Sequence, residues 1–220
     1  MGVRVALHLK GVVDYDFLQE RLGEKSQLLL ESNPVYKKIP VLIHNHNPVC
    51  ESMIIVEYAD EAWAASGRAI RTADPYDRAL HRFWAACIDD EVRVAPRRPT
   101  FFCLVKAETQ EARAEAMEQS LAGLELLEES LAKLSKGRGF VGGDAMAYLD
   151  IALGCYLGWM KACETVIGHR FLDEEKTPLL VGWAERFCSH EAVKDWMPET
   201  DELLELAKVL QPKRKVSTAN

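Results

Sequence analysis

A single change of pattern, near residue 70, constrains this chain of 220 residues more than any other feature. Before it, short strand-like and helix-like segments alternate, whereas every periodic segment after Asp74-Pro75 is helical. The clearest spans residues 108–136, where Met117 and five leucines recur at steps of three and four residues, and Gly137 ends it. The length suits one large domain or two small ones. The change of pattern favours two, so we predict an α/β unit followed by an all-helical unit.

The opening segment fits two structures. Apolar and polar residues interleave from Gly2 to Leu9, as in a strand, but Gly11 then ends the segment, as glycine ends many helices. This pattern alone does not decide between them. The next segment, Val12 to Gln19, alternates and carries β-branched and aromatic residues, so we predict a strand there.

The rest of the first unit predicts a helix, a hairpin and a second helix. Lys25 to Ser32 is helix-like, with Ser26 as its cap. Apolar segments at 41–43 and 48–50 flank the polar turn HNHN, which is typical of a hairpin. A helix then begins at Ser52, where apolar residues recur at helical spacing.

The second unit consists of helices. Asp74 fits a helix cap, and Pro75 stands in the first turn, where proline is tolerated. We predict helices over residues 76–94, 108–136, 147–164, 178–188 and 200–210. The predicted division is a first domain over 1–64, a linker over 65–74, a helical domain over 75–210 and a flexible tail over 211–220.

Composition argues against several classes of function. The formal net charge of −7 disfavours binding to nucleic acid or an anionic membrane, and no apolar run reaches the roughly 20 residues of a membrane span. The six cysteines form no CxxC pair and the six histidines show no ligand spacing, so we expect no metal site. Scattered cysteines in apolar segments are typical of reduced thiols, which indicates a cytosolic protein.

Pro40 stands at the start of the predicted strand 41–43, where its missing N–H is tolerated. Most such bonds are trans, and a simple trans turn is the commoner structure. With a cis bond, the backbone of Ile39 would turn outward. Its amide and carbonyl would then be free to pair with a bound peptide, as in an added strand.

Glu51 and Ser52 lie where the helix after the hairpin begins. An ordinary cap beside a solvated acid is the commoner structure for such a pair. The free amides of a first helical turn also suit a carboxylate, and Glu51 suits an ammonium, so together they match the free end of an α-amino acid. Lys25 and Lys38 would suit a second carboxylate, although exposed lysines are commonplace.

Asp150 is an acid within an apolar segment, three residues after Ala147. At that spacing its carboxylate can reach back to the Ala147 amide, as in a capping box. We expect this folding role rather than buried catalysis. Trp84, Trp159 and Trp183 lie in apolar helical segments, where core packing is the default role.

Each of these signals is weak alone, but their order is that of a known family. Residues 32–52, SNPVYKKIPVLIHNHNPVCES, resemble the glutathione-binding segment of plant glutathione transferases, above all the tau class. Residues 73–90 are similar to the start of that family's helical domain, residues 137–154 to its Gly-rich turn and capping box, and residues 176–187 to a late helix. The resemblance extends over nearly the whole chain.

The resemblance implies a thioredoxin-like domain, then an all-helical domain, usually in a homodimer with Tyr76 to Asp90 at its interface. It also implies glutathione as co-substrate. Carried over by position, Lys25 and Lys38 would meet the glycine carboxylate of glutathione. Ile39, before a cis Pro40, would pair with the cysteinyl backbone. Glu51 and Ser52 would hold the γ-glutamyl end.

The electrophile would lie between the domains, against the helix around Trp84 to Pro96, with Val92 and Pro96 as candidates, and near Trp159. Family members begin with a strand and a turn whose serine stabilises the glutathione thiolate, before a helix similar to VRVALHLKG. The match here begins within that turn. The resemblance therefore places the catalytic serine and the first strand before Met1, and it favours a helix for residues 2–9. It also predicts an open sheet edge and puts turnover by this chain in doubt.

Three functions fit these patterns. The leading one is conjugation of glutathione to hydrophobic electrophiles, such as herbicides and stress-derived products. A second is a non-catalytic carrier that binds glutathione or apolar ligands without turnover. A third is a thiol-transfer enzyme of the related cysteine-type classes, which is disfavoured because Cys50 does not align with the cysteine those enzymes use.

Overall fold

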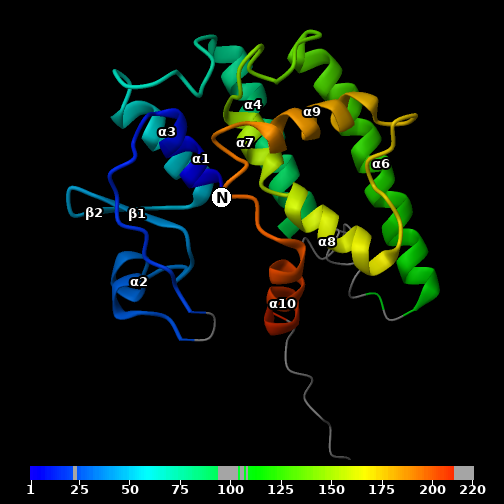
Figure 1. Cartoon of the computed structure of the whole chain (residues 1–220), viewed down its shortest axis with the longest axis horizontal. Helices are drawn as coiled ribbons and strands as arrows, with labels where there is room; N and C mark the ends of the chain where they lie inside the picture. Colours follow the sequence, from blue (N-terminus) through cyan, green and yellow to red (C-terminus); the bar gives the residue numbers. More distant parts are fainter. Residues whose placement is uncertain (22–23, 94–103, 105–106, 108, 211–220) are drawn as a thin grey trace, which may run out of the picture.

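The protein contains two units in the predicted order. The computed structural model describes residues 1–21, 24–93, 104, 107 and 109–210. The first unit comprises α1 (Gly2–Leu9), α2 (Gln27–Ser32), β1 (Val41–His44), β2 (Asn47–Cys50) and α3 (Ser52–Ala62). The second comprises α4 (Pro75–Arg93), α6 (Gln110–Ser135), α7 (Tyr148–Gly154), α8 (Leu157–Ile167), α9 (Pro178–Ser189) and α10 (Thr200–Leu210). Figure 1 shows the hairpin and α2 on one side of the molecule and α6 on the other.

The opening segment is helix α1, the structure that the resemblance favoured. Its Val5 amide donates to the carbonyl of Met1 at 3.1 Å, and Gly11, at φ 68°, ends the segment. The apolar residues that could equally have marked a strand form one buried face of the helix, which includes Val5, Ala6 and Leu9. That face packs on α3 and on α7, so α1 joins the two units.

The predicted short helix and hairpin are confirmed. Ser26 caps α2, because its hydroxyl accepts from the Leu29 amide at 3.1 Å. β1 and β2 pair antiparallel, with Val41 opposite Cys50. The turn residues Asn45 and His46 both have positive φ, at 50° and 66°, as a tight two-residue hairpin turn requires.

The strand predicted over Val12–Gln19 is wrong. The described sheet has two strands, β1 and β2, and residues 12–19 pair with neither. A strand needs a neighbour for its backbone groups, and this segment instead leaves Val13, Phe17 and Leu18 exposed, at 79%, 58% and 66%. It is held by a contact of another kind, because the Arg4 guanidinium lies 4.4 Å from the centre of the Phe17 ring.

The single helix predicted over 147–164 is also wrong, because the chain forms α7 and α8 with a break at Cys155-Tyr156. The Tyr156 amide bonds to Leu153 at 3.1 Å, three residues back, which tightens the last turn of α7. Gly154 stands just before the break, against the Phe187 ring, and glycine is a weak helix former. The spacing of apolar residues within 147–164 does not indicate this contact with α9.

The remaining helices follow the predictions closely. Asp74 accepts from the Asp77 amide at 2.8 Å and so caps α4. α6 begins two residues later than predicted, because Thr109 is its cap and accepts from the Ala112 amide at 3.1 Å. The predicted helices over 178–188 and 200–210 are confirmed as α9 and α10.

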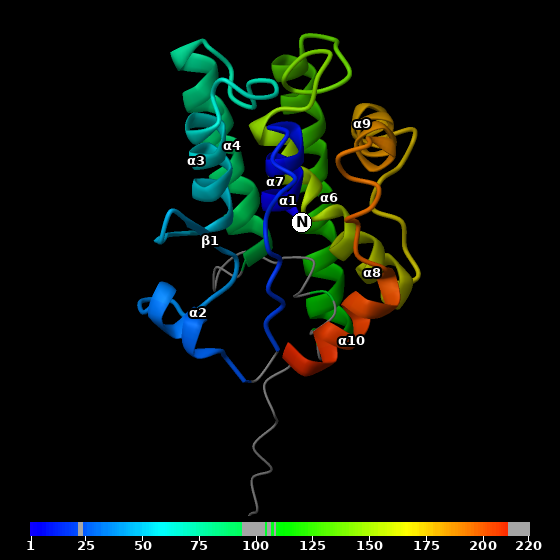
Figure 2. The ribbon, with the colours of Figure 1, turned by 60° about the vertical axis from the view of Figure 1, so that its left-hand side comes forward.

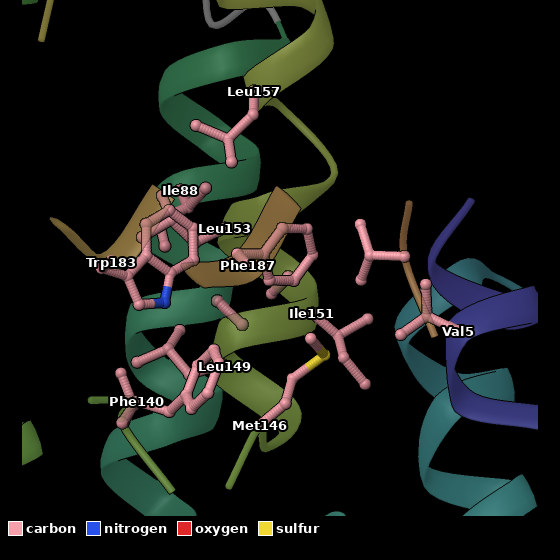
Figure 3. Packing of buried hydrophobic residues seen from close by; sticks show 14 of the residues in the cluster. Val5, Ile88, Phe140, Met146, Leu149, Ile151, Leu153, Leu157, Trp183 and Phe187 are labelled. Carbon is pink, nitrogen blue, oxygen red and sulfur yellow. The ribbon is translucent and has the colours of Figure 1, made fainter. Parts of the chain in front are cut away.

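The core lies mainly between α4, α7 and α9. Figure 3 shows Trp183 and Phe187 of α9 beside Leu153 of α7, with Ile151 turned toward Val5 of α1. The two aromatic rings stack at a centroid distance of 5.4 Å, and Ile151 and Val5 are fully buried. Trp183 is 1% exposed, which confirms its predicted place in the core.

A buried ion pair fixes the connection between the units. The Lys10 ammonium at the end of α1 lies 3.2 Å from the Asp60 carboxylate of α3 and also donates to the Arg68 carbonyl at 3.1 Å. Asp60 accepts in addition from the amides of Ile70 and Arg71, at 2.8 and 3.2 Å. These bonds hold residues 68–71 against the ends of both helices.

Three general features apply to the described residues. None of their helices is both long and apolar enough to cross a membrane. No three of their His, Cys, Asp and Glu side chains gather as metal ligands do. Their five cysteines, 50, 87, 155, 163 and 188, are free thiols.

Candidate functional site

A buried asparagine shapes the loop that leads into β1. Asn33 is 3% exposed. Its side-chain oxygen accepts from the Tyr36 amide at 3.1 Å, and its amide nitrogen donates to the Lys38 carbonyl at 2.9 Å. Sequence reasoning missed this residue, since the Asn-Pro pair indicated only the end of a helix. The bonds fold residues 33–38 into a tight loop that presents Lys38 and Ile39 to solvent.

The hairpin register brings two predicted parts of the site together. Because Val41 pairs with Cys50, residues 39–40 and 51–52 lie at the same end of the hairpin. The bond between Ile39 and Pro40 is cis, the less common of the two forms considered from the sequence. The Ile39 side chain is 60% exposed, so nothing within the described chain covers it fully.

The start of α3 has backbone donors that no side-chain cap within the helix satisfies. Glu51 occupies the cap position and Ser52 the first turn, so the expectation that Ser52 caps the helix is corrected by one residue. No side chain caps this end, and the first bond of the helix runs from the Ile55 amide to the Glu51 carbonyl at 2.9 Å. The amides before Ile55 therefore lack a partner within the helix and point toward its N-terminal side.

Glu51 has an unusual backbone. Its φ is 72° with ψ 123°, in a region that favours glycine and that costs other residues about 1–3 kcal/mol. Such residues concentrate at binding and catalytic sites, because the surrounding structure must hold them there. This geometry directs the chain sharply from β2 into α3.

The two lysines lie in the segments that lead into α2 and β1. Lys38 directly precedes Ile39, and Lys25 directly precedes Ser26, the cap of α2. Both lysines are exposed. Since α2 packs on β1, Lys25 belongs to the same half of the first unit, although no contact joins it to the other site residues.

The predicted electrophile site is only partly within the described residues. Pro96 lies outside them, and so does the side chain of Val92 in α4. Trp159, in α8, is half-buried. The Tyr156 hydroxyl donates to the Asp89 carboxylate at 2.7 Å, which ties the second half of α4 to the start of α8, the two helices that carry Val92 and Trp159.

Asp150 has the predicted folding role. Its carboxylate is fully buried and accepts from the Ala147 amide at 2.8 Å. It also accepts from the amides of Val141 and Gly142, at 3.0 and 3.3 Å, and from the Trp183 indole at 2.8 Å. Burial raises the pKa of Asp150, while these four donors oppose that rise. The residue therefore fixes the loop before α7 and is not a site residue.

Models of two protein domains match the chain. The model described as glutathione S-transferase, N-terminal domain, matches residues 1–61. The model described as glutathione S-transferase, C-terminal domain, matches residues 97–191. Both agree with the order of the two units.

Curated relatives are similar over nearly the whole chain. Glutathione S-transferase U18 of Arabidopsis thaliana is 52% identical over 215 residues, which cover 98% of this chain and 92% of the relative. Glutathione S-transferase U17 of the same plant is 51% identical over 213 residues, which cover 97% and 91%.

Solved structures show the same similarity. The tau-class glutathione S-transferase MiGSTU from mango, Mangifera indica, superposes with a TM-score of 0.88 at 51% identity, covering 95% of this chain and 92% of that one. Rice GST1 (OsGSTU1), solved in complex with glutathione, superposes with a TM-score of 0.81 at 30% identity, covering 95% and 90%.

Proposed function

Because the chain belongs to the tau class of the glutathione S-transferase family, we propose that it conjugates glutathione to hydrophobic electrophiles. In this reaction a bond forms between the glutathione sulfur and an electrophilic carbon, the thiol loses its proton, and a leaving group departs where the electrophile carries one. The observation that carries the proposal is the register of the hairpin, which sets Ile39 and Pro40 beside Glu51 and Ser52.

We place the glutathione backbone along residue 39. An extended peptide can add to an exposed edge by pairing main-chain groups, and Ile39 stands at such an edge, before Val41 of β1. The γ-glutamyl end then lies at the start of α3. Its carboxylate would accept from the free amides near Ser52, where the helix dipole favours an anion, and its ammonium would lie beside Glu51.

The other end of glutathione carries the glycine carboxylate, which Lys25 and Lys38 would neutralise. Both side chains are exposed and unpaired by any acid in the described chain. Each contributes as a mobile point charge, which suits an anion near the protein surface. Among the described residues we assign none to the sulfur itself.

The electrophile would lie on the helical unit, beside Trp159 and Val92 of α4. Pro96, outside the described residues, stays a further candidate. Trp159 offers an aromatic face that is half-buried. The bond between Tyr156 and Asp89 holds its helix against α4.

The test is a pair of measurements on the purified chain. Calorimetry gives the dissociation constant for glutathione, and absorbance follows its conjugation to 1-chloro-2,4-dinitrobenzene. We expect Glu51→Gln and Ser52→Ala each to weaken glutathione binding about tenfold or more. The first removes the negative charge that would face the ammonium, and the second removes a hydroxyl that would donate to the γ-glutamyl carboxylate beside the helix amides.

Matched controls are Glu174→Gln and Ser66→Ala, which make the same changes at exposed residues far along the chain from the site. The controls should bind as the wild type does. If the site variants also bind like the wild type, the proposed placement of glutathione is wrong. Binding without conjugation by the wild type would support the carrier function instead.

We further propose a cytosolic homodimer that takes part in detoxification. Tyr76 and Phe83 of α4 are 70% and 58% exposed, which leaves large apolar side chains on the segment that the resemblance places at the interface. Light scattering should give twice the chain mass of 24.8 kDa, and Tyr76→Glu with Phe83→Glu should give a monomer. The domain boundaries at 1–64, 65–74 and 75–210 stay a prediction, which limited proteolysis between residues 65 and 74 would test.

A further inference from the structure

A cavity of about 370 Å³ lies away from the proposed glutathione site, between the end of α6 and α9. Leu131 and Ala132 of α6 and Leu179 of α9 give it apolar walls, and Arg138 and Arg186 also line it. Its size falls within the range of small-ligand pockets in proteins. An apolar wall with a few convergent polar groups is the usual character of such a pocket.

Glycines allow both arginines to lie along the cavity. A Cβ added at Gly139 or Gly182 would come within 3.4 Å of Arg186, and one added at Gly143 would come within 2.8 Å of Arg138. The Arg186 guanidinium also donates through Nε to the Gly139 carbonyl at 3.0 Å. Its position is therefore set by the loop, while its terminal nitrogens remain available.

The charges around the cavity leave it positive. Neither Arg138 nor Arg186 forms an ion pair with any residue of the described chain. Lys136 is paired with Asp77 at 3.6 Å. Glu128 of α6 accepts from the Leu179 and Leu180 amides at 2.7 and 2.8 Å, so its carboxylate faces the first turn of α9.

The last turn of α6 makes the electrostatic potential of the cavity less positive, since the C-terminal end of a helix is its negative end. Its effect is limited here, because the Ser135 carbonyl accepts from the Arg138 amide at 3.0 Å. Two guanidinium groups outweigh the fractional charge of one helix end.

We propose that this cavity binds an amphipathic organic carboxylate, with its acid group between Arg138 and Arg186 and its apolar body against Leu131 and Leu179. A guanidinium matches the planar, two-oxygen geometry of a carboxylate.

The cavity is a second site and not part of the first. In Figure 1 the β1–β2 hairpin and α2 lie on the opposite side of the molecule from α6. In Figure 2, β1 and α2 again lie on the opposite side from α9. Glutathione and the carboxylate should therefore bind independently.

The experiment is calorimetric titration of the full chain with 2-naphthoate, and with 2-naphthamide as its uncharged analogue. We expect the amide to bind about tenfold more weakly or worse, because it lacks the charge that the arginines recognise. Arg138→Gln should weaken naphthoate binding by a similar factor. Ala132→Phe, which fills the cavity without changing any charge, should also weaken it.

The matched control is Lys133→Gln, which removes one positive charge next to Ala132 from an exposed side chain that does not line the cavity. It should change the affinity less than twofold. Glutathione binding should be unchanged in all three variants, which shows that each is folded. The proposal is overturned if naphthoate does not bind, if saturating glutathione displaces it, or if Arg138→Gln and Ala132→Phe both bind it like the wild type.

Discussion

Replacement of Asp150 by alanine is the most direct test of how the helical unit is held together. The wild-type carboxylate accepts from four donors that belong to three separate parts of the chain: the loop at Val141 and Gly142, the amide of Ala147, and the Trp183 indole of α9. The variant leaves all four without this acceptor. The Asp150 side chain is fully buried.

The size of the effect follows from the burial of each donor. The residues Val141, Ala147 and Trp183 are 7%, 5% and 1% exposed, so water cannot replace the lost acceptor for them. At about 1.5 kcal/mol for each buried donor, the loss is about 4.5 kcal/mol. Part of this is recovered, because burial of the carboxylate is itself unfavourable and raises the pKa of Asp150. We therefore expect the free energy of unfolding to fall by about 3–4 kcal/mol.

Urea denaturation followed by far-UV circular dichroism measures this change. Asp144→Ala is the control, since Asp144 lies in the same loop but is exposed, and it should change stability by about 0.5 kcal/mol or less. An Asp150→Ala variant within about 1 kcal/mol of the wild type would refute the reasoning, because the four donors would then be satisfied in some other way.

Three other predictions concern stability. Burial lowers the pKa of His81, whose Nδ1 has no partner among the described residues. The unfolded chain therefore binds more protons below about pH 6.5, so stability should decline from pH 7 to 5, and His81→Gln should flatten that decline in thermal melts. Asp60→Ala leaves the buried Lys10 ammonium without its carboxylate partner and should lower the free energy of unfolding by about 3 kcal/mol in urea melts. An unchanged urea midpoint would contradict the buried ion pair. Gly154→Ala should destabilise strongly, because its Cβ would enter the Phe187 ring, while Gly123→Ala, with open space in mid-helix, should raise the melting temperature.

Local chemistry was enough to predict much of the fold. The hairpin follows from a polar two-residue turn between apolar segments, and Ser26, Asp74 and Gly137 mark helix ends through their own side chains or backbone freedom. The cap of α7 follows from the spacing of Ala147 and Asp150. In each case the interacting groups lie a few residues apart, so one short segment of the sequence contains both of them.

Interactions between distant segments were not predictable in this way. Val12–Gln19 has the pattern of a strand, yet a strand also requires a neighbour, which a pattern of alternation does not supply. The break after Gly154 depends on Phe187 of α9. Asn33, which shapes the loop before Ile39, gave no signal beyond that of a helix end.

The site shows the same division. The residue types at positions 39–40 and 51–52 were singled out from the sequence, and their proximity follows from the pairing of Val41 with Cys50. The positive φ of Glu51 was not foreseen, because an acid at that position fits an ordinary helix start equally well. Arg138 and Arg186 gave no signal at all, since they are separated by 48 positions in the sequence and line one cavity only in the fold.

The most direct measurement is a crystal structure of the chain with glutathione bound. The account predicts that the cysteinyl backbone of glutathione pairs with the main chain of Ile39, and that the γ-glutamyl carboxylate accepts from the first amides of α3, with the ammonium beside Glu51. Glutathione found elsewhere, or bound without contact to either Ile39 or the start of α3, would contradict it.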